Sequence, residues 1–292
     1  MLQILRQPNA EPLHRDEVKT YSRVGGTADD KLMDRLIGAA RRYVEQFTGR
    51  PLVCTTYQLA IDRFPAIIWG VRSPAMQPLV LDNMWYRPGI DAIHLVVGPV
   101  VKVNSLKYID GQGVTQTYDP ANYIVDTITE PARLTPLPSR PWPATQFRIN
   151  AVTVEWVAGY AAPFTANATA DTLTVRGRTF ANGDVVRLSN SGGALPAGLT
   201  VNTDYYVVNA SGDGTTIQLS TTAAGTPVDL TDTGAGLSFL GVIPDDILAA
   251  LQLVVGDLYE HREAQTEYTL ESNSAVRNLL YPYRIYPVQD IQ

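Results

Sequence analysis

The chain has 292 residues, of which 45% are hydrophobic, and it carries a net charge of −6. This length and composition allow a sizeable core, while the acidic balance argues against a protein that binds nucleic acid by counterion release. No window reaches the ~18 apolar residues of a membrane span, and the first residues lack the apolar core of a signal peptide, so we expect neither membrane insertion nor secretion. Cys54 is the only cysteine, which excludes an internal disulfide and a thiolate zinc cluster and fits synthesis in a reducing cytoplasm.

Two helices are predicted near the N-terminus, over residues 13–24 and 27–48. In the second, apolar residues recur at steps of three and four and form one face. Thr27 is the expected N-cap of this helix, and Gly49 stands where a left-handed C-cap belongs. The apolar residues of that face are Leu32, Leu36, Ala40, Tyr43 and Phe47.

The pattern changes to a period of two from residue 52, which predicts a β-rich region over residues 52–160. A hairpin is expected around the turn at residues 110–113. Residues 130–143 are rich in proline and are expected to form an irregular surface loop. The expected strands are residues 56–61, 100–108, 115–125 and 151–157.

Residues 163–240 are rich in Thr, Gly, Ala, Asn and Asp and nearly free of Lys and Glu. Short alternating segments separated by glycine-containing turns predict a small all-β sandwich or barrel, inserted into a surface loop of the remaining chain. Its expected strands are residues 172–175, 184–189, 204–209, 216–220 and 237–240, with a turn at Gly212–Gly214 among those between them.

The clearest helical pattern of the C-terminal region covers residues 244–263. Its apolar face and that of helix 27–48 both need a partner, so we expect the two helices to pack on each other. A short helix is expected over 272–280. Tyr281, Tyr283 and Tyr286 follow in a proline-stiffened arm, for which an interface with a partner is favoured over packing back onto the chain itself.

No constellation of residues predicts catalysis or metal binding. His14, His94 and His261 are isolated from one another and from other ligands. Asp245 and Asp246 are explained by the positive end of a helix dipole. The sequence has no P-loop, no GxSxG and no dinucleotide-binding motif, so we expect a protein that is not an enzyme and binds no cofactor.

Five segments outside the predicted insert recur together in one known family, and their order and spacing make the match specific. They are EPLHRDEVKTYSRVGGTADDKLMDRLIGAARRYVEQFTGRPL, YQLAIDRFP, VTVEWVAGY, VIPDDILAALQLVVGDLYEHREA and NLLYPYRI, and they cover nearly all of the chain outside the insert. On these segments the chain resembles the head–tail connector, or adaptor, proteins of long-tailed bacteriophages, in the long form that carries an inserted β domain. Within the insert, the segment PAGLTVNTDYYVVNASGDGTTIQLS is similar to small β modules of phage virion proteins.

The resemblance implies a structural subunit of the virion neck that forms a ring of about twelve copies beneath the portal. Such a ring extends the channel, lets double-stranded DNA pass without specific binding, and offers a platform to the next neck or tail completion protein. The expected fold class is α+β, with a connector body (1–162 and 241–280), an inserted β domain (163–240) and a C-terminal arm (281–292). The residues implied to bind the portal are Leu279, Leu280, Tyr281, Pro282, Tyr283, Arg284, Ile285, Tyr286 and Pro287.

Two other functions remain as alternatives. In the first, the chain is a carbohydrate- or surface-binding virion protein that acts through the β insert. Aromatic side chains would form its sugar site, but alternation places several of them inward, which favours a core. In the second, the chain is an enzyme acting on DNA or cell wall, which the lack of clustered histidines and paired acids disfavours. The aromatic residues of the insert are Phe164, Phe180, Tyr205, Tyr206 and Phe239.

Overall fold

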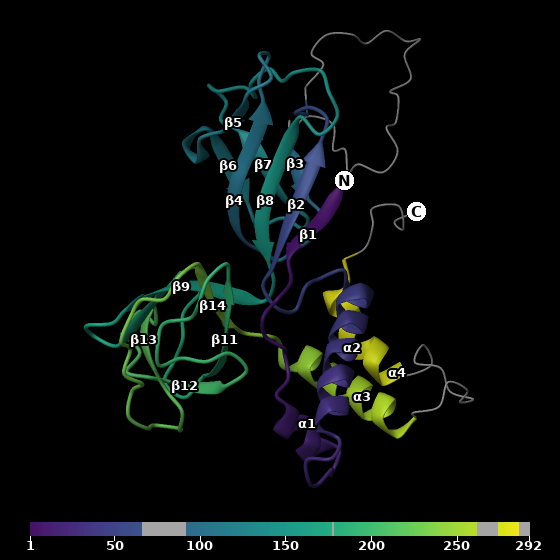
Figure 1. The fold of residues 1–292 in the computed structure, drawn as a ribbon, viewed down its shortest axis with the longest axis vertical. Helices are drawn as coiled ribbons and strands as arrows, with labels where there is room; N and C mark the ends of the chain where they lie inside the picture. Colours follow the sequence, from purple (N-terminus) through teal and green to yellow (C-terminus); the bar gives the residue numbers. More distant parts are fainter. Residues whose placement is uncertain (66–91, 177, 262–273, 286–292) are drawn as a thin grey trace. The chain divides into compact units, whose positions relative to one another are not determined.

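The chain forms two compact units, and Figure 1 labels most of their helices and strands. The first unit contains Met1–Ile4 and the described part of Tyr57–Val157, and the second contains Leu5–Thr56 and the described part of Ala158–Ile285. Helices and strands are both present, as the predicted α+β class requires. The division into body, insert and arm remains a prediction. The computed structural model describes residues 1–65, 92–176, 178–261 and 274–285.

Two β-sheets form the first unit. One has five strands in the order β1-β2-β8-β4-β5, and the other has three in the order β3-β7-β6. Trp156 is fully buried: its ring stacks on Tyr57 and its Nε1 donates to the Val97 carbonyl oxygen at 3.1 Å, which satisfies the indole. The strands are β1 (Leu2–Arg6), β2 (Thr55–Ile61), β3 (Ile93–Leu95), β4 (Val100–Ile109), β5 (Thr115–Thr117), β6 (Tyr123–Asp126), β7 (Ala132–Pro136) and β8 (Val152–Ala158).

The sequence predicted the central strands of the first unit but not all of its edges. The strands expected over 56–61 and 151–157 are β2 and β8, and the expected hairpin is formed by β4 and β5. The second strand of this hairpin, β5, ends at Thr117 and is shorter than the predicted strand over residues 115–125. The Asp119 carboxylate accepts from a backbone N–H and starts a 3₁₀ turn at Pro120–Asn122, after which β6 joins the other sheet.

The irregular loop expected over 130–143 is partly wrong, because β7 runs through it. Ala132 and Leu134 are buried on the core side of this strand. The alternation of buried and partly exposed residues therefore favours a strand here, despite the prolines on either side. Pro131 and Pro136 lie just before the strand and at its last residue, where a missing backbone donor is tolerated.

Residues 161–241 contain a closed barrel with the strand order β10-β13-β12-β11-β14-β9. The five strands predicted here correspond to β10–β14. The strand β9 was missed because its sequence, AAPFTAN, combines a proline with small residues, yet it closes the barrel by pairing with both β10 and β14. The strands are β9 (Ala161–Asn167), β10 (Thr172–Val175), β11 (Val185–Ser191), β12 (Asp204–Val208), β13 (Thr216–Ser220) and β14 (Leu237–Gly241).

The predicted glycine turn between β12 and β13 is organised by Asp213. Its carboxylate accepts hydrogen bonds from the Ser211 hydroxyl and from both the backbone N–H and the hydroxyl of Thr215, and these bonds lower the pKa of Asp213 to about 2. Because the folded-state pKa is depressed, the stabilisation is complete above the ordinary aspartate value of about 3.9 and is lost as the pH falls towards 2. An NMR titration of this carboxyl is expected to give a midpoint near pH 2; a midpoint near 4 would show that the turn is not formed.

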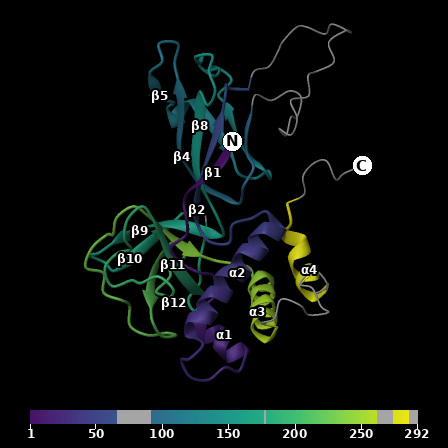
Figure 2. The same ribbon diagram turned by 45° about the vertical axis from the view of Figure 1, so that its right-hand side comes forward.

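Four α-helices share one hydrophobic core in the second unit. Figure 2 shows α2, α3 and α4 side by side. On α2 the residues Met33, Ile37 and Val44 are buried, and they pack with the buried Leu251 and Val254 of α3. The helices are α1 (Arg15–Tyr21), α2 (Asp30–Thr48), α3 (Asp245–Glu260) and α4 (Ser274–Leu280), followed by the 3₁₀ turn η3 (Tyr281–Tyr283).

The C-terminal end of α2 was predicted correctly, whereas its N-terminal end was not. Gly49 ends the helix in the left-handed conformation, with a φ of 72°, as its position predicted. The N-cap is Asp29 rather than Thr27, and its side chain makes no capping hydrogen bond. The Asp29 carboxylate instead accepts from the hydroxyl of Tyr259 on α3 at 2.7 Å, so tertiary contact between the helices takes precedence over the local cap.

Candidate functional site

The predicted portal-binding segment lies at the end of α4 and in η3. Leu279 and Leu280 complete the helix, and η3 follows at once. Tyr286 and Pro287 lie outside the described residues. The local conformation follows from sequence, since Pro282 fits the first positions of a short helical turn.

The apolar side of this segment packs into the helical core. Leu280 has no exposed surface, while Leu279 and Tyr283 are partly buried against the same cluster. Val276, one turn before Leu280 in α4, is also buried. The leucine pair therefore attaches the segment to the helical core, with Leu280 as its buried anchor.

Polar contacts fix the segment after α4 to the C-terminal end of α2. The backbone N–H of Ile285 donates to the Thr48 carbonyl oxygen at 2.8 Å, and Arg50 Nε donates to the Tyr283 carbonyl oxygen at 2.5 Å. The guanidinium of Arg284 lies over the ring of Phe47, 5.5 Å from its centroid. The chain thus returns onto the helix that the sequence paired with α3.

A further contact joins the segment to the start of α3. The hydroxyl of Tyr283 donates to Asp246 Oδ2 at 3.2 Å. Desolvation and, after it, the bond to Asp246 raise the pKa of Tyr283 further above neutrality, and the protonated phenol is the donor in this bond. Asp246 therefore combines its expected place in the first helical turn with a second role as an acceptor.

The exposed side of the segment consists of Tyr281, Pro282 and Arg284. Tyr281 supplies the aromatic ring of this group and is 58% exposed. Both alternatives considered for the arm are therefore represented: part of the segment packs back on the chain, and part presents surface. An aromatic ring and a cation are thus exposed next to the buried Leu280.

His14 and His261, which could in principle bind a metal or transfer a proton, instead make contacts within the helices. His14 caps α1 by accepting from the Asp16 backbone N–H, and His261 contacts Asp257 one turn earlier in α3. His94 lies in β3. Within the described residues no group of three His, Cys, Asp or Glu side chains could hold a metal ion.

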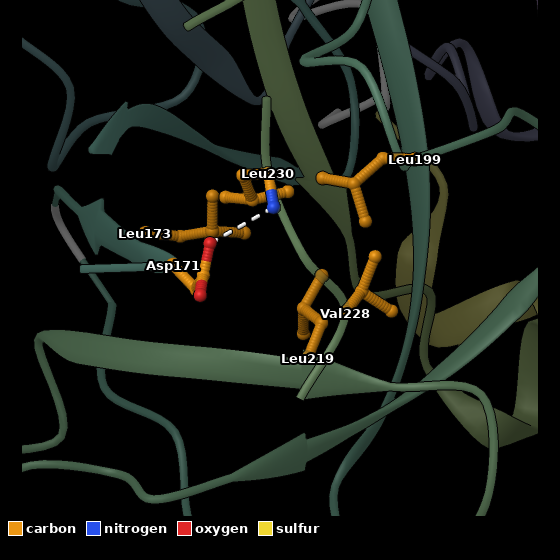
Figure 3. Close-up of a pocket in the computed structure, with 6 residues that line it drawn as sticks. All are labelled: Asp171, Leu173, Leu199, Leu219, Val228 and Leu230. Atoms are coloured by element: carbon orange, nitrogen blue, oxygen red, sulfur yellow. Dashed lines mark hydrogen bonds between the residues drawn. The ribbon is translucent and has the colours of Figure 1, made fainter. Parts of the chain in front are cut away.

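The hollow in the barrel is a gap in an aliphatic core (Figure 3). It is too narrow for a water molecule. The one carboxylate at its rim, Asp171, accepts from the Leu230 backbone N–H at 2.9 Å. The barrel aromatics Phe164, Phe180, Tyr205 and Phe239 are buried, as alternation predicted, so they do not form a stacking surface for a sugar. The other lining residues are Leu173, Leu199, Leu219 and Val228.

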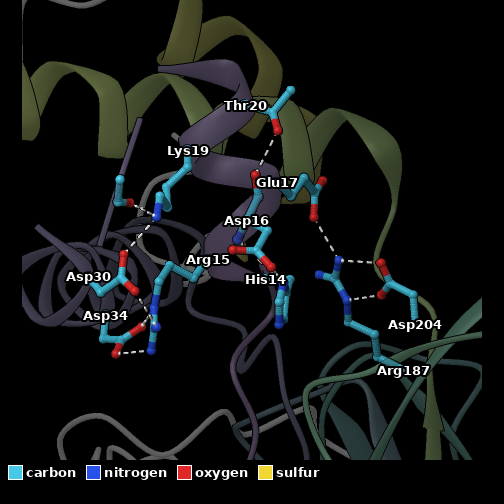
Figure 4. Close-up of polar contacts among 11 residues, drawn as sticks. His14, Arg15, Asp16, Glu17, Lys19, Thr20, Asp30, Asp34, Arg187 and Asp204 are labelled. Atoms are coloured by element: carbon cyan, nitrogen blue, oxygen red, sulfur yellow. Dashed lines mark hydrogen bonds and ion pairs between the residues drawn. The ribbon is translucent and has the colours of Figure 1, made fainter. Parts of the chain in front are cut away.

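A polar cluster that the sequence did not reveal joins the barrel to α1 (Figure 4) and to the segment before α1. Arg187 of β11 donates to Glu17 of α1 at 2.6 Å and to Asp204 of β12 at 2.5 Å. Its third contact is with the Pro12 carbonyl oxygen. The side chain is only 18% exposed, so this cation is desolvated and paired on three sides.

Two amide side chains continue the same attachment. The Asn9 side chain accepts from the backbone N–H of Asn190, and Asn202 accepts from the backbone N–H of Glu11. Glu11 in turn forms an ion pair with the buried Arg41 of α2 at 2.8 Å. The segment before α1 is therefore held between the barrel and the helices by side-chain contacts on both sides.

Ion pairs also order the entry to α2. Arg15 contacts Asp34 at 2.6 Å and Asp30 at 3.0 Å, and Lys19 contacts Asp30 at 2.7 Å (Figure 4). The two cations of α1 lower the pKa of Asp30, with the Lys19 hydrogen bond as the largest cause. These charges of α1 and α2 satisfy one another, which is a structural rather than a catalytic arrangement.

No family model matches the sequence, and no curated protein sequence matches it significantly. The fold is similar to that of a chain from the neck of an empty GTA particle computed with C6 symmetry, at 14% identity and a TM-score of 0.54, covering 99% of this chain and 97% of that one. A chain from the virion of a native gene transfer agent (GTA) particle gives 14% identity and a TM-score of 0.52 over the same shares. The likeness shows a common fold along the whole length. No helix among the described residues combines the length and apolarity needed to cross a bilayer.

Proposed function

We propose that the chain is a structural subunit of the neck of a phage-like particle, where it serves as the head–tail connector. Copies form a ring beneath the portal, lengthen the DNA channel and offer a platform to the next neck or tail protein. The observation that carries the proposal is the whole-length likeness to a chain from a GTA neck. The sixfold symmetry given for that neck is compatible with a ring of about twelve copies.

The charge and the polar contacts of the chain support a role that depends on surfaces rather than on chemistry. A net charge of −6 favours a passage through which DNA slides over one that holds it. His14 caps a helix, and His261 and Asp30 form ion pairs. We assign the ring body to α2 and α3, whose shared core supplies a rigid wall, and treat the barrel as the inserted domain.

The portal-binding surface is proposed to lie at residues 279–287. The buried Leu280 fixes this segment to the helical core, while the exposed Tyr281, Pro282 and Arg284 are proposed to contact the portal. An aromatic side chain on a preorganised segment loses little conformational entropy on binding, which makes Tyr281 the expected centre of the contact.

Replacing Tyr281 with alanine is expected to weaken binding to the portal protein of the same particle at least about tenfold, because truncating a central aromatic typically costs more than 1 kcal/mol of binding. Stability is expected to change by less than about 0.5 kcal/mol, since the side chain is mostly exposed. Native mass spectrometry of portal mixtures and biolayer interferometry measure the effect. Tyr21→Ala, at a 47% exposed tyrosine of α1, is the matched control and is expected to bind like the wild type.

The same mixtures test the function itself. The wild-type chain is expected to bind the portal with roughly twelve copies per ring. A wild-type chain that stays unbound at high concentration would reject the connector function. Wild-type binding that Tyr281→Ala leaves unchanged would reject only the assignment of the arm.

A further inference from the structure

The barrel strand β11 changes its partner along its length. It pairs with β12 over residues 185–187 and with β14 over residues 187–191. At the start of the strand the Val207 N–H of β12 donates to the Asp184 carbonyl oxygen. Alternation therefore turns the backbone groups of Leu188 and Asn190 to the same side, beyond the point where β12 stops pairing. The second half of β11 thus has a barrel strand on one side only.

The outer face of this half of β11 is polar, yet it is covered. Val186 and Leu188 belong to the barrel core, so Ser189 and Ser191 point out of the barrel. Both serines are nevertheless buried, with exposed fractions of 5% and 9%. The Ser191 hydroxyl lies 3.2 Å from the hydroxyl of Thr56. Segments from outside the barrel therefore lie against this strand.

Residues 6–12, here called the strap, lie on the open side of β11. The Asn9 side chain accepts from the Asn190 backbone N–H at 3.1 Å. Just beyond the strand, the guanidinium of Arg6 occupies the space that a side chain at Gly192 would need. The Asn190 side chain donates to the Ala235 carbonyl oxygen at 2.8 Å. The residue that binds Asn9 is thus held in place by the barrel itself.

Two barrel side chains bind the other end of the strap. Asn202 accepts from the Glu11 backbone N–H at 2.9 Å, and Arg187 donates to the Pro12 carbonyl oxygen. Together with the Asn190 N–H, these groups recognise a pattern: a side-chain oxygen, an N–H two residues later, and a carbonyl oxygen on the residue after that. The barrel therefore presents a set of donors and acceptors that matches one short peptide segment.

The strap is attached differently from the strands of the barrel. Each of its hydrogen bonds to β11 and Asn202 has a side chain as donor or acceptor, whereas the barrel strands are joined by backbone ladders. The barrel also closes without it. On its other side the strap is joined to α2 by the ion pair of Glu11 with Arg41. The strap thus connects two parts that each have their own core.

We propose that the open side of β11 is a peptide-binding site, and that the strap is its ligand within the same chain, held as a latch that opens without unfolding the barrel. A few side-chain hydrogen bonds contribute far less than the barrel ladders, so the strap detaches by local opening. A partner peptide with the same pattern of donors and acceptors binds the site once the strap has left. The proposal goes beyond the neck function and does not depend on it.

Hydrogen exchange of the full chain measures the opening. The amides of Asn190 and Glu11 are expected to exchange at least about 100-fold faster than that of Val207, which is bonded inside the barrel. Low concentrations of urea are expected to leave the two strap amides unchanged, since local opening exposes little surface. Exchange of all three amides at one rate would overturn the proposal, because the strap would then be an integral part of the barrel.

Two substitutions test whether the strap opens as a unit. Asn9→Ala and Asn202→Gly each remove one acceptor, and each is expected to speed the exchange of both strap amides about tenfold. Glycine is chosen at Asn202 because its φ is 58°. Asn182→Ala is the matched control, since Asn182 accepts from the Ala210 N–H elsewhere in the barrel, and it is expected to change neither amide. Effects confined to the amide nearest each substitution would contradict a latch.

A peptide added in trans tests the binding site itself. A synthetic peptide of residues 5–12 is used at about 10 mM, above the millimolar effective concentration of a short tether. In the Asn9→Ala protein it is expected to restore the slow exchange of the Asn190 amide, whereas the same peptide with alanine at position 9 does not. Absence of protection, or equal protection by both peptides, would overturn the assignment of the site. Neither result involves the portal, so the proposed function is tested separately.

Discussion

Replacing Arg187 with methionine is expected to lower the free energy of unfolding of the second unit by about 2–4 kcal/mol. The substitution keeps the apolar stem but removes the contacts to Glu17, Asp204 and the Pro12 carbonyl oxygen. Glu17 and Asp204 are 36% and 42% exposed and regain water, so the loss stays below that of a fully buried pair. The same change is expected to loosen residues 12–17 from the barrel, while the hydrogen bonds of Asn9 and Glu11 to the barrel remain.

Urea unfolding measures the free energy, and hydrogen exchange of the segment before α1 reports the local release. Arg176→Met is the matched control, because this exposed arginine lies just after β10 in the same barrel, and it is expected to change stability by less than about 0.5 kcal/mol. Equal stability of the two variants would contradict the idea that Arg187 attaches the barrel to the N-terminal segment.

Replacing Leu280 with alanine is expected to destabilise the second unit by about 2–5 kcal/mol, since this side chain is fully buried in the helical core. The loss combines the transfer free energy of the removed atoms with the cavity they leave. Because Leu280 anchors η3, the variant is also expected to loosen the backbone bond between Ile285 and Thr48. Portal binding then falls through loss of preorganisation rather than through loss of a contact.

The neighbouring leucine provides the control. Leu279 is only partly buried against the same cluster, so Leu279→Ala is expected to cost less than about 1.5 kcal/mol. Thermal unfolding and the exchange rate of the Ile285 amide compare the two variants. If Leu280→Ala were as stable as Leu279→Ala, the segment would not be anchored as the structure indicates.

Periodicity predicted those elements whose burial repeats regularly. The buried faces of α2 and α3 follow the helical spacing, but on α2 the buried apolar residues are Met33, Ile37, Ala40 and Val44. Of the predicted face only Ala40 is buried, while Leu32, Leu36, Tyr43 and Phe47 are partly exposed. The strands β10 and β13 have the boundaries read from alternation. The segments that were missed lack such a signal. Every residue of β1 is exposed, and β9 carries Pro163 among small residues, so both depend on neighbouring strands rather than on their own pattern.

The candidate site was only partly accessible from sequence. Tyrosines among prolines indicated the segment after α4, but nothing local showed that Leu280 is buried while Tyr281 is exposed. Arg187 gave no signal, because its partner Glu17 is 170 residues away in the sequence. Tertiary ion pairs of this kind follow from how the barrel folds against α1, which no window of sequence encodes.

The position of the chain in the particle tests the connector function most directly. Cryo-electron microscopy of the neck of the assembled particle is expected to show the chain as a closed ring between the portal and the next neck protein, with DNA or an open channel on its axis. Density for the chain on the capsid or tail surface, or an assembly that does not close around the axis, would contradict the proposed function.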